Sequence, residues 1–568
     1  MTANGDSGVP MLLILAACAG PTSTSPADTP TDSGDTGEFP GGAEADVVYD
    51  IAVLHEVVVT LADADWAALR VQERNFYELF DEGCMDGPWG NPYTWFNAEV
   101  QIDGEGLGPV GVRKKGLLGS VTPDRPSLRI SVDHVVPGAT FHGLEKLVLN
   151  NGRQDPSRLR TCLAHQFFSD AGLVAPRCAL AHVTVNGEDL GVYAQTEAID
   201  ELLVARDEGV LPAALYEGTL SDFREGWLAT FEAESVGADG MELTAVSNAL
   251  LVDDDGLMAA LDEIVDLDRY VTFWVAESLA GHWDGYNGNT NNFYVYATGV
   301  DGRLRFIASG PDSVWDSRTP FGAGAPLWVA TASALSNRLI QHTEGRERFL
   351  TETQRQLDDV WNGDARVAQI DAWAELVEPV DDSTQREGIA SLRSLVRQRG
   401  ADLAASLGGR FEAPALRGEL CWSDIGVVNV DFATTWGSYP DGDLYTGGVA
   451  EPYFELNGAE YVAIESGAST GWADESDALW LTISRIAEET WLAPYVVFDE
   501  ALAIPGADVP IDGVAATAML LYSSPETGGA WTNAAYLGNG TLHFDDAGTT
   551  TGDAVVGRLE VHVLGQAE

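Results

Sequence analysis

The chain changes character near residue 410, and this change limits the folds that it can adopt. Before it, residues 46–197 alternate strand-like runs with turns, and residues 335–408 are strongly helical. After it, residues 415–568 contain few basic residues and many short runs of Val, Leu, Tyr and Trp between Gly, Asp and Thr clusters. Sheet followed mostly by helices predicts an α+β domain over 46–410, and short strands with frequent turns predict an all-β sandwich domain over 415–568.

The N-terminal residues indicate export. Residues 11–20 read MLLILAACAG, a short apolar run that ends in small residues around Cys18. This run resembles a bacterial lipobox, whose cysteine is lipidated after signal cleavage, although the first ten residues lack the usual Lys or Arg. Residues 19–45 are rich in Pro, Thr, Ser, Asp and Gly and cannot bury a core. We therefore predict a lipoprotein signal peptide over 1–18, a disordered tether over 19–45, and a lipid anchor on Cys18 that holds an exported protein at the cell envelope.

Acidic residues far outnumber basic ones. The 568 residues include 88 acids and 31 bases, which gives a net charge of -57. Such a surface repels nucleic acid and anionic membranes, so we expect no nucleic-acid partner. The same acidity can also serve solubility alone, and it does not identify a function.

Four cysteines remain besides Cys18, and their state stays open at this point. They are Cys84, Cys162, Cys178 and Cys421, and none forms a C-x-x-C pair. The missing C-x-x-C spacing argues against a zinc cluster. In an exported protein one or two disulfides are expected, but buried free thiols fit equally well, and four cysteines allow three full pairings.

The densest basic segment surrounds two glycines. Residues 113–120 read RKKGLLGS, and Arg125 and Arg129 follow them. Glycines beside cations allow backbone N–H groups to approach a phosphate. A basic hairpin that pairs with surrounding acids has the same composition, so this segment alone is a weak signal.

One segment combines an acid, several amides and an aromatic strand. Residues 281–296 read GHWDGYNGNTNNFYVY. His282, Asp284 and Asn289 have the spacing of a kinase catalytic loop, in which the Asp orients the substrate hydroxyl and the Asn holds a metal ion. An Asx-rich loop that caps a strand is the alternative interpretation of the same residues.

A second acid follows the next strand. Residues 302–309, GRLRFIAS, lead directly to Gly310 and Asp312. An Asp after a buried strand is well placed to ligate Mg²⁺, and an ordinary turn is the alternative. The full order is a basic Gly loop, a helix, a hairpin with an Asn186-Gly187 turn, an Asp/Asn loop, a strand and an Asp. That is the order of the phosphoryl-transfer parts of a kinase.

In this order the segments resemble the spore coat protein H (CotH) kinase family, atypical secreted kinases with a distant kinase-like fold. The resemblance covers roughly residues 46–410 and implies an atypical kinase-like CotH domain there. It rests on an ordered set of segments: Asp65-Trp66-x-x-Leu69, the loop at 113–120, SLRISVD, LNNGRQDPSRLR, VNGEDLGVYAQTE, DGYNGNTNNFYVY and FIASGPDSVWD.

The resemblance implies a nucleotide site. Gly116, Gly119 and Ser120 match the Gly/Ser loop of the family and would lie over the phosphates of ATP. Arg125 stands where the family usually has a Lys, and Glu197 falls where the family also has a Glu. An Arg is always charged and presents a fork instead of a point charge, so it is not an equivalent substitute for Lys.

The resemblance also implies a catalytic acid and metal ligands. Asp284 matches the catalytic Asp, and Asn292 and Asp312 match residues that would hold Mg²⁺ or Mn²⁺. Asn289 competes with Asn292 for the metal on spacing alone. Gly310 replaces the first acid of the family's D-x-D, so one candidate ligand is missing.

These residues predict an enzyme and leave one alternative. We expect an envelope-bound atypical protein kinase that transfers the γ-phosphoryl group of ATP to hydroxyl groups of secreted or surface proteins. The alternative is a catalytically inactive CotH-fold lipoprotein with a binding or structural role at the spore or envelope surface. Arg125 and Gly310 favour the alternative.

Overall fold

The computed structural model describes most of the chain from residue 39 onward. The predicted signal peptide with Cys18, residues 19–38 of the tether, and Gly119 and Ser120 lie outside the described residues. The described ranges are 39–117, 121–316, 331–406, 413–437, 449–456, 459–462, 465–470, 477–487, 490–513, 515–525, 532–548 and 550–566.

The predicted tether is too long at its C-terminal end. Residues Ala43–Tyr49 form the 3-10 helix η1, and Ala45 is fully buried in the core of the first sheet. Arg177 donates hydrogen bonds to the carbonyl oxygens of Gly41 and Gly42 at 2.7 and 2.9 Å. The prediction of disorder up to residue 45 is therefore wrong for these last residues, because they pack on the folded domain.

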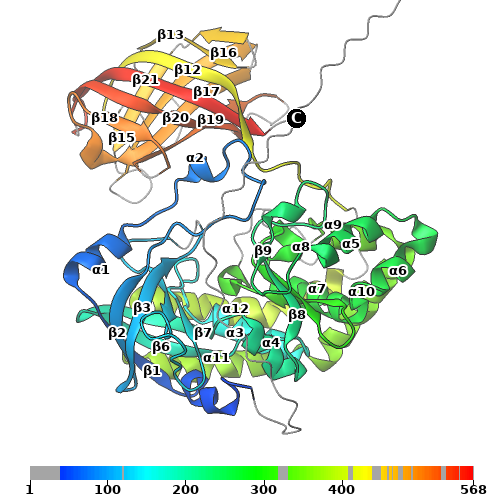
Figure 1. Cartoon of the computed structure of the whole chain (residues 1–568). Coiled ribbons are helices and arrows are strands. Elements are labelled where there is room, and N and C mark those ends of the chain that lie inside the picture. The colour runs from blue at the N-terminus through cyan, green and yellow to red at the C-terminus, as the bar shows by residue number, and fades with distance from the viewer. Residues whose placement is uncertain are drawn as a thin grey trace, which may run out of the picture. The chain divides into compact units, whose positions relative to one another are not determined.

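The first sheet is a closed barrel in the described part of the chain (Figure 1). Its strand order is β1-β2-β3-β4-β5-β7-β6, and β1 closes the barrel by pairing with β6 in parallel. Strand β1 shows why the sequence forms it: Val57 and Val59 are fully buried and the residues between and beside them are exposed, the period of two of a half-buried strand. The strands are β1 (Leu54–Thr60), β2 (Phe96–Ile102), β3 (Glu105–Lys115), β4 (Ser127–Ser131), β5 (Lys146–Asn150), β6 (Cys178–Val185) and β7 (Glu188–Glu197).

A second, four-stranded sheet carries the aromatic strand predicted after the Asn-rich loop. Its order is β11-β10-β8-β9, with β8 (Pro212–Gly218), β9 (Glu232–Ala233), β10 (Phe293–Thr298) and β11 (Leu304–Ala308). All residues of β10 are buried, so the aromatic run is covered on both faces as predicted. Phe293 lies against Gly218, where a Cβ atom would approach the ring to 2.2 Å, so only glycine fits there.

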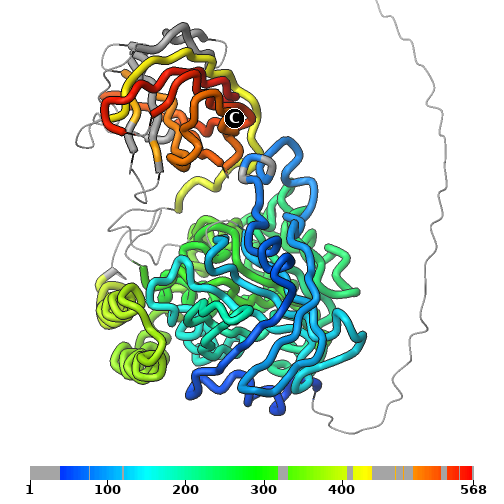
Figure 2. The backbone as a smooth tube through the Cα atoms, turned by 90° about the vertical axis from the view of Figure 1, so that its left-hand side faces the viewer, coloured from blue at the N-terminus to red at the C-terminus, as the bar shows by residue number. Residues whose placement is uncertain are grey.

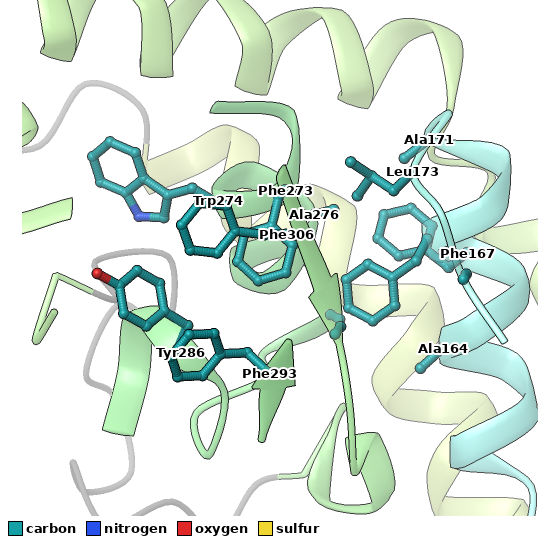
Figure 3. Packing of buried hydrophobic residues seen from close by; sticks show 14 of the residues in the cluster. Ala164, Phe167, Ala171, Leu173, Phe273, Trp274, Ala276, Tyr286, Phe293 and Phe306 are labelled. Atoms are coloured by element: carbon teal, nitrogen blue, oxygen red, sulfur yellow. The ribbon is translucent and has the colours of Figure 1, made fainter. Parts of the chain in front are cut away.

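Helices pack around the second sheet and form one apolar core with it. Figure 3 shows α7 residues Phe273 and Trp274 beside Phe306, Phe293 and Tyr286. The helices α11 and α12, yellow-green in Figure 2, lie side by side. The helices are α1 (Asp63–Arg70), α2 (Phe76–Leu79), α3 (Arg160–Asp170), α4 (Glu201–Glu208), α5 (Met241–Leu250), α6 (Asp254–Asp262), α7 (Leu267–Ala280), α8 (Tyr286–Asn289), α9 (Ala334–Gln341), α10 (Thr343–Asp359), α11 (Gly363–Val377) and α12 (Ser383–Ser406).

The predicted α+β class is confirmed by this arrangement of barrel, sheet and helices. Short 3-10 helices complete it: η2 (Leu228–Thr230), η3 (Pro311–Ser313) and η4 (Glu500–Leu502). Among the described helices, none combines the length and the apolarity that crossing a bilayer requires.

Strands alone make up the regular structure after residue 421, apart from η4, within the described residues. They pair antiparallel along one path, β14-β13-β12-β21-β20-β19-β17-β16-β15, and β18 pairs with β20. The all-β prediction is therefore confirmed, and a two-sheet sandwich stays a prediction. The strands are β12 (Trp422–Thr435), β13 (Val449–Leu456), β14 (Ala459–Val462), β15 (Glu465–Thr470), β16 (Asp477–Ala487), β17 (Thr490–Asp499), β18 (Asp508–Ile511), β19 (Ala516–Ser523), β20 (Thr532–Ala547) and β21 (Ala554–Gln566).

The structure decides between the cysteine alternatives. Cys162 pairs with Cys178, and Cys84 pairs with Cys421, with Cα–Cα distances of 5.1 and 5.5 Å. The first disulfide ties α3 to β6. The second ties the segment after α2 to the segment before β12, across 337 residues of sequence. Disulfides that close long loops restrict the unfolded chain and thereby stabilise the fold.

Candidate active site

One cavity brings together the three segments that the sequence singled out. Its volume is about 600 Å³, within the range of ligand pockets. Residues of β3, β4 and β5 line one side, and the Asn-rich loop with the turn after β11 lines the other. Arg113, Lys115 and Arg129 belong to the first group, and Asp284 and Asp312 belong to the second.

Asp284 is held by three side-chain amides. Asn289 Nδ2 lies 2.6 Å and Asn291 Nδ2 3.2 Å from Asp284 Oδ1, and Asn292 Nδ2 lies 2.8 Å from Asp284 Oδ2. Both carboxylate oxygens are thus fixed, which gives the group one orientation. A carboxylate has about four acceptor sites, so these three bonds leave room for a hydroxyl proton. The predicted catalytic residue therefore lies in a cavity with the geometry of a positioned base.

The loop around Asp284 is anchored by a buried acid on α7. Glu277 is fully buried, and it accepts hydrogen bonds from the backbone N–H groups of Tyr286 and Asn287 and from Asn287 Nδ2 at 2.7 Å. His282 Nδ1 lies 3.1 Å from the same carboxylate. His282 is buried and does not line the cavity, so its part in the predicted catalytic-loop spacing is structural.

Two residues of this loop have left-handed backbone conformations. Thr290 has φ of 52° and Asn292 has φ of 49°. A β-branched residue seldom adopts positive φ, and such strain persists only where neighbours impose it. Here Ser221 N donates to Thr290 O at 2.7 Å, and Ser309 N donates to Asn292 O at 2.9 Å. This conformation turns the side chains of Asn289, Asn291 and Asn292 toward Asp284.

The structure distinguishes the two candidate metal-binding asparagines. Asn289 Oδ1 accepts a hydrogen bond from Arg417 at 2.9 Å, while its Nδ2 donates to Asp284. Flipping this amide would turn its oxygen toward a carboxylate and its N–H toward a guanidinium. The oxygen of Asn289 thus faces a cation, which argues against this residue as a metal ligand. Asn292 stays a predicted ligand, and its Oδ1 faces the turn at Gly310.

That turn explains the acid missing from position 310. Gly310 has φ of 54°, and a Cβ atom there would lie 2.8 Å from Asn292 Oδ1. An acid at 310 therefore does not fit beside Asn292 in this conformation. Asp312, two residues on, lines the cavity. Burial, together with the charges of Asp155 and Asp284, raises the pKa of Asp312 to about 6.

Strands β3 and β4 supply three of the cations that line the cavity, and Arg74 and Arg417 are the others among the described residues of its lining. Lys115 Nζ donates to Asn150 Oδ1 at 2.8 Å, and burial together with Arg129 lowers the pKa of Lys115 to about 8. Arg113 and Arg129 are direct cross-strand neighbours in the register of β3 and β4. In the sequence these residues formed a basic segment, and none of them had a place in the predicted site. Lys114, which lies between Arg113 and Lys115, is also basic, so no alternation of polar and apolar residues marked which of them enter the cavity.

The prediction that Arg125 binds nucleotide is wrong. Its guanidinium donates to the carbonyl oxygens of Leu190 and Val192, both at 2.7 Å, and lies over the ring of Tyr193. It does not line the cavity. The alignment placed Arg125 as a substitute for a lysine, but Lys115 is the lysine that lines the cavity, ten positions earlier on β3.

Glu197 lines the cavity and stays a prediction as a cofactor-binding residue. Its carboxylate binds Arg177 at 2.7 Å and also pairs with Arg206, and these ion pairs hold it at the end of β7. Gly116 does line the cavity, with φ of 129°, and accepts a hydrogen bond from Tyr93 Oη at 3.0 Å.

Glu217 and Glu232, two further acids that line the cavity, cluster with Glu234, and the sequence had signalled none of the three. Carboxylate oxygens of Glu217, Glu232 and Glu234 come within 4.8 Å of one another. Burial and the charge of Glu217 raise the pKa of Glu234 to about 7. These residues belong to β8, β9 and the chain directly after β9, and β9 is only two residues long. A strand this short has no detectable period, so only the pairing of β8 with β9 reveals the cluster.

The part of the chain that contains this site matches a known protein family. The sequence model of the family described as CotH kinase protein matches residues 112–392, which contain the basic strand, Asp284 and Asp312. The chain belongs to the CotH family. Inner spore coat protein H of Bacillus subtilis (strain 168) is 22% identical over 258 residues, or 42% of this chain and 70% of that protein. Invasin CotH3 of Rhizopus delemar is 22% identical over 244 residues, or 37% of this chain and 40% of that protein.

Two solved structures also align with this CotH-family chain at low scores. The Helicobacter pylori proinflammatory kinase CtkA is 11% identical and has a TM-score of 0.25, covering 49% of this chain and 92% of that one. The HipA–HipB–operator DNA complex of Shewanella oneidensis MR-1 is 9% identical and has a TM-score of 0.28, covering 61% of this chain and 72% of that one. We draw nothing about this chain from scores of that size.

Proposed function

We propose that this CotH-family protein is an atypical protein kinase that transfers the γ-phosphoryl group of ATP to protein hydroxyl groups. One observation carries the proposal: Asp284, fixed by three amides, shares a cavity with Lys115, Arg113 and Arg129. Phosphoryl transfer needs these two features, a positioned acceptor of the hydroxyl proton and cations for the phosphates.

In this proposal one residue accepts the proton of the substrate hydroxyl, and the cations bind the phosphates. The substrate hydroxyl hydrogen-bonds to Asp284, which orients its oxygen toward the γ-phosphorus and accepts its proton. A new P–O bond forms as the bond between the γ-phosphorus and the β–γ bridging oxygen breaks, and ADP leaves with that electron pair. Lys115 and the arginines of β3 and β4 balance the phosphate charge, as preorganised cations do in phosphoryl transfer.

Asn292 and Asp312 would hold a divalent cation. A carboxylate and an amide oxygen are hard donors of the kind that Mg²⁺ and Mn²⁺ take. Burial, and then the charges of neighbouring acids, raise the pKa of Asp312, and a bound cation would favour its ionised form. When bound, such an ion neutralises phosphate charge.

The proposed place of action is outside the cytoplasm, on secreted or surface proteins. The similar proteins are named as a spore coat protein and an invasin, and both names denote a surface location. Two disulfides fit an oxidising compartment. Export through the segment at 1–18 and a lipid anchor on Cys18 belong to the same proposal.

A binding or structural role without catalysis is the second candidate. Gly310 favours it, because the site has one carboxylate fewer than the family pattern. A protein of this kind would keep the cavity and transfer no phosphate.

Calorimetry with the full chain tests the proposal. We expect ATP to bind with Mg²⁺ or Mn²⁺ more tightly than with EDTA, and label from γ-labelled ATP to appear on protein. Metal-dependent binding without transfer would support the non-catalytic candidate. Absence of nucleotide binding under every condition would contradict both the kinase proposal and the assignment of the cavity.

Lys115 and Arg125 give a paired test of the phosphate side of the cavity. Lys115→Met should weaken ATP binding by about 10- to 100-fold, the value of a charge-assisted hydrogen bond. Arg125→Met should leave ATP affinity unchanged and lower the free energy of unfolding by about 1–3 kcal/mol, because two bonds from its guanidinium to β7 are lost. Titration and denaturant unfolding measure the two effects, with exposed Arg153→Met as the control. If instead Arg125→Met weakens ATP binding and Lys115→Met does not, Arg125 is the nucleotide-binding residue.

A further inference from the structure

The segment that connects α12 to β12 contacts the loop of Asp284. We call residues 413–421 the linker strap. Residues 414–416 and 418–419 are exposed, whereas Arg417 is half-buried and lines the cavity. The CotH family model matches residues 112–392, and the strap follows that range in the sequence.

Arg417 binds the loop through three hydrogen bonds. Its guanidinium donates to Asn289 Oδ1 at 2.9 Å, to Asn289 O at 3.2 Å and to Thr290 Oγ1 at 2.9 Å. Asn289 Nδ2 in turn donates to Asp284 Oδ1 at 2.6 Å. Asn289 therefore links the guanidinium of the strap to the carboxylate. The bond to Thr290 holds the residue whose backbone has the unfavourable positive φ.

The strap itself is fixed along its length. The carbonyl oxygen of Arg417 accepts a hydrogen bond from Arg224 at 2.6 Å, and that of Pro414 accepts one from Asn337 at 2.9 Å. Arg224 is held by the buried carboxylate of Asp222 at 2.7 Å. At its C-terminal end the strap is joined to the segment between α2 and β2 by the disulfide between Cys421 and Cys84. Arg417 is thus presented from an anchored segment.

We propose that Arg417 is a positioning residue that orients Asp284 through Asn289, and that the disulfide at Cys421 keeps the strap in place for this. The inference rests on the proposed kinase function for its kinetic consequence only. Its structural consequence, a loop ordered by the strap, stands independently of the reaction. The strap would then make the CotH domain depend on the chain that follows it.

Kinetics of the full-length Arg417→Met variant test the positioning role. With γ-labelled ATP and casein as the acceptor probe, we expect kcat to fall about tenfold with KM for ATP within about twofold. Arg417→Lys should recover part of kcat, since one ammonium can replace part of the fork. Leu416→Ala, the adjacent exposed position, is the matched control. A rise in KM at constant kcat would overturn the proposal, because Arg417 would then be a direct nucleotide ligand.

Amide hydrogen exchange gives a second readout that needs no activity. The backbone N–H groups of Asn289 and Thr290 are bonded to Gly285 O and Tyr286 O. In Arg417→Met we expect exchange over residues 286–291 to quicken about tenfold, with α7 unchanged. If the wild type transfers no label and exchange in Arg417→Met still quickens, the kinase proposal fails, and the ordering of the loop by Arg417 is supported. Unchanged exchange in the variant would contradict the ordering of the loop by Arg417.

The disulfide is tested by the double variant Cys84→Ser/Cys421→Ser. Releasing one end of the strap should quicken exchange over the same residues. Combined with Arg417→Met it should add little, because both changes remove the same restraint. Additive effects would overturn the part assigned to the disulfide. Unaltered exchange throughout α7 serves as the check that the domain is folded.

Discussion

Replacing Asp284 by alanine is expected to lower the rate of phosphoryl transfer by about a thousandfold, the usual contribution of a positioned proton acceptor. The carboxylate that orients the hydroxyl is lost, while the cations on β3 and β4 stay in place. ATP affinity should therefore change little. Single-turnover transfer of label from γ-labelled ATP measures the rate, and calorimetry measures the affinity.

Alanine suits this test better than asparagine. Three amide N–H groups point at Asp284, and an asparagine there would turn an N–H group toward one or more of them. Asp268→Asn, at an exposed position on α7, controls for the loss of a negative charge. Full turnover in Asp284→Ala would show that the catalytic acid has been assigned to the wrong residue.

Replacing Asp312 by asparagine is expected to weaken metal-dependent ATP binding by about 10- to 100-fold, because a charged ligand becomes neutral. The dependence of metal affinity on pH should also differ between the wild type and this variant. Metal binds the ionised carboxylate, and the pKa of Asp312 is raised to about 6 by burial, Asp155 and Asp284. In the wild type the metal affinity should therefore fall as pH drops below about 6 and level off above it.

Below that value each pH unit should reduce the wild-type affinity by about tenfold, since one proton competes with the metal. In Asp312→Asn the part of this dependence that Asp312 contributes should be lost, and the part caused by protonation of the ATP phosphate should remain. Titrations of Mn²⁺ with ATP from acidic to neutral pH measure both curves, and exposed Asp255→Asn is the control. An identical pH dependence in wild type and Asp312→Asn would exclude Asp312 as the ligand.

Local sequence patterns predicted much of the secondary structure. Asn186 and Gly187 both have positive φ, as the predicted hairpin turn requires. The apolar run 293–296 is a fully buried strand, as its composition indicated. The class of each half of the chain followed from periodicity, because the period of the apolar residues is set by the geometry of the backbone.

The identity of the cavity residues depended on how distant elements meet. Sequence alignment placed Arg125 at the nucleotide, but its guanidinium donates to the carbonyl oxygens of Leu190 and Val192 on β7. Lys115 enters the cavity because it lies on the face of β3 opposite to Val110 and Val112, which pack in the barrel core. Position along the chain does not specify which side of a barrel strand a residue occupies once irregular turns intervene.

The sequence by itself determined Asp284, Asn292 and Asp312 as candidates and the division into an α+β and an all-β part. Only the tertiary structure decided that the oxygen of Asn289 faces Arg417, and that Cys421 pairs with Cys84. The physical reason is the same in both cases. Hydrogen bonds and disulfides join residues more than a hundred positions apart, and such contacts depend on packing of whole elements that no local pattern encodes.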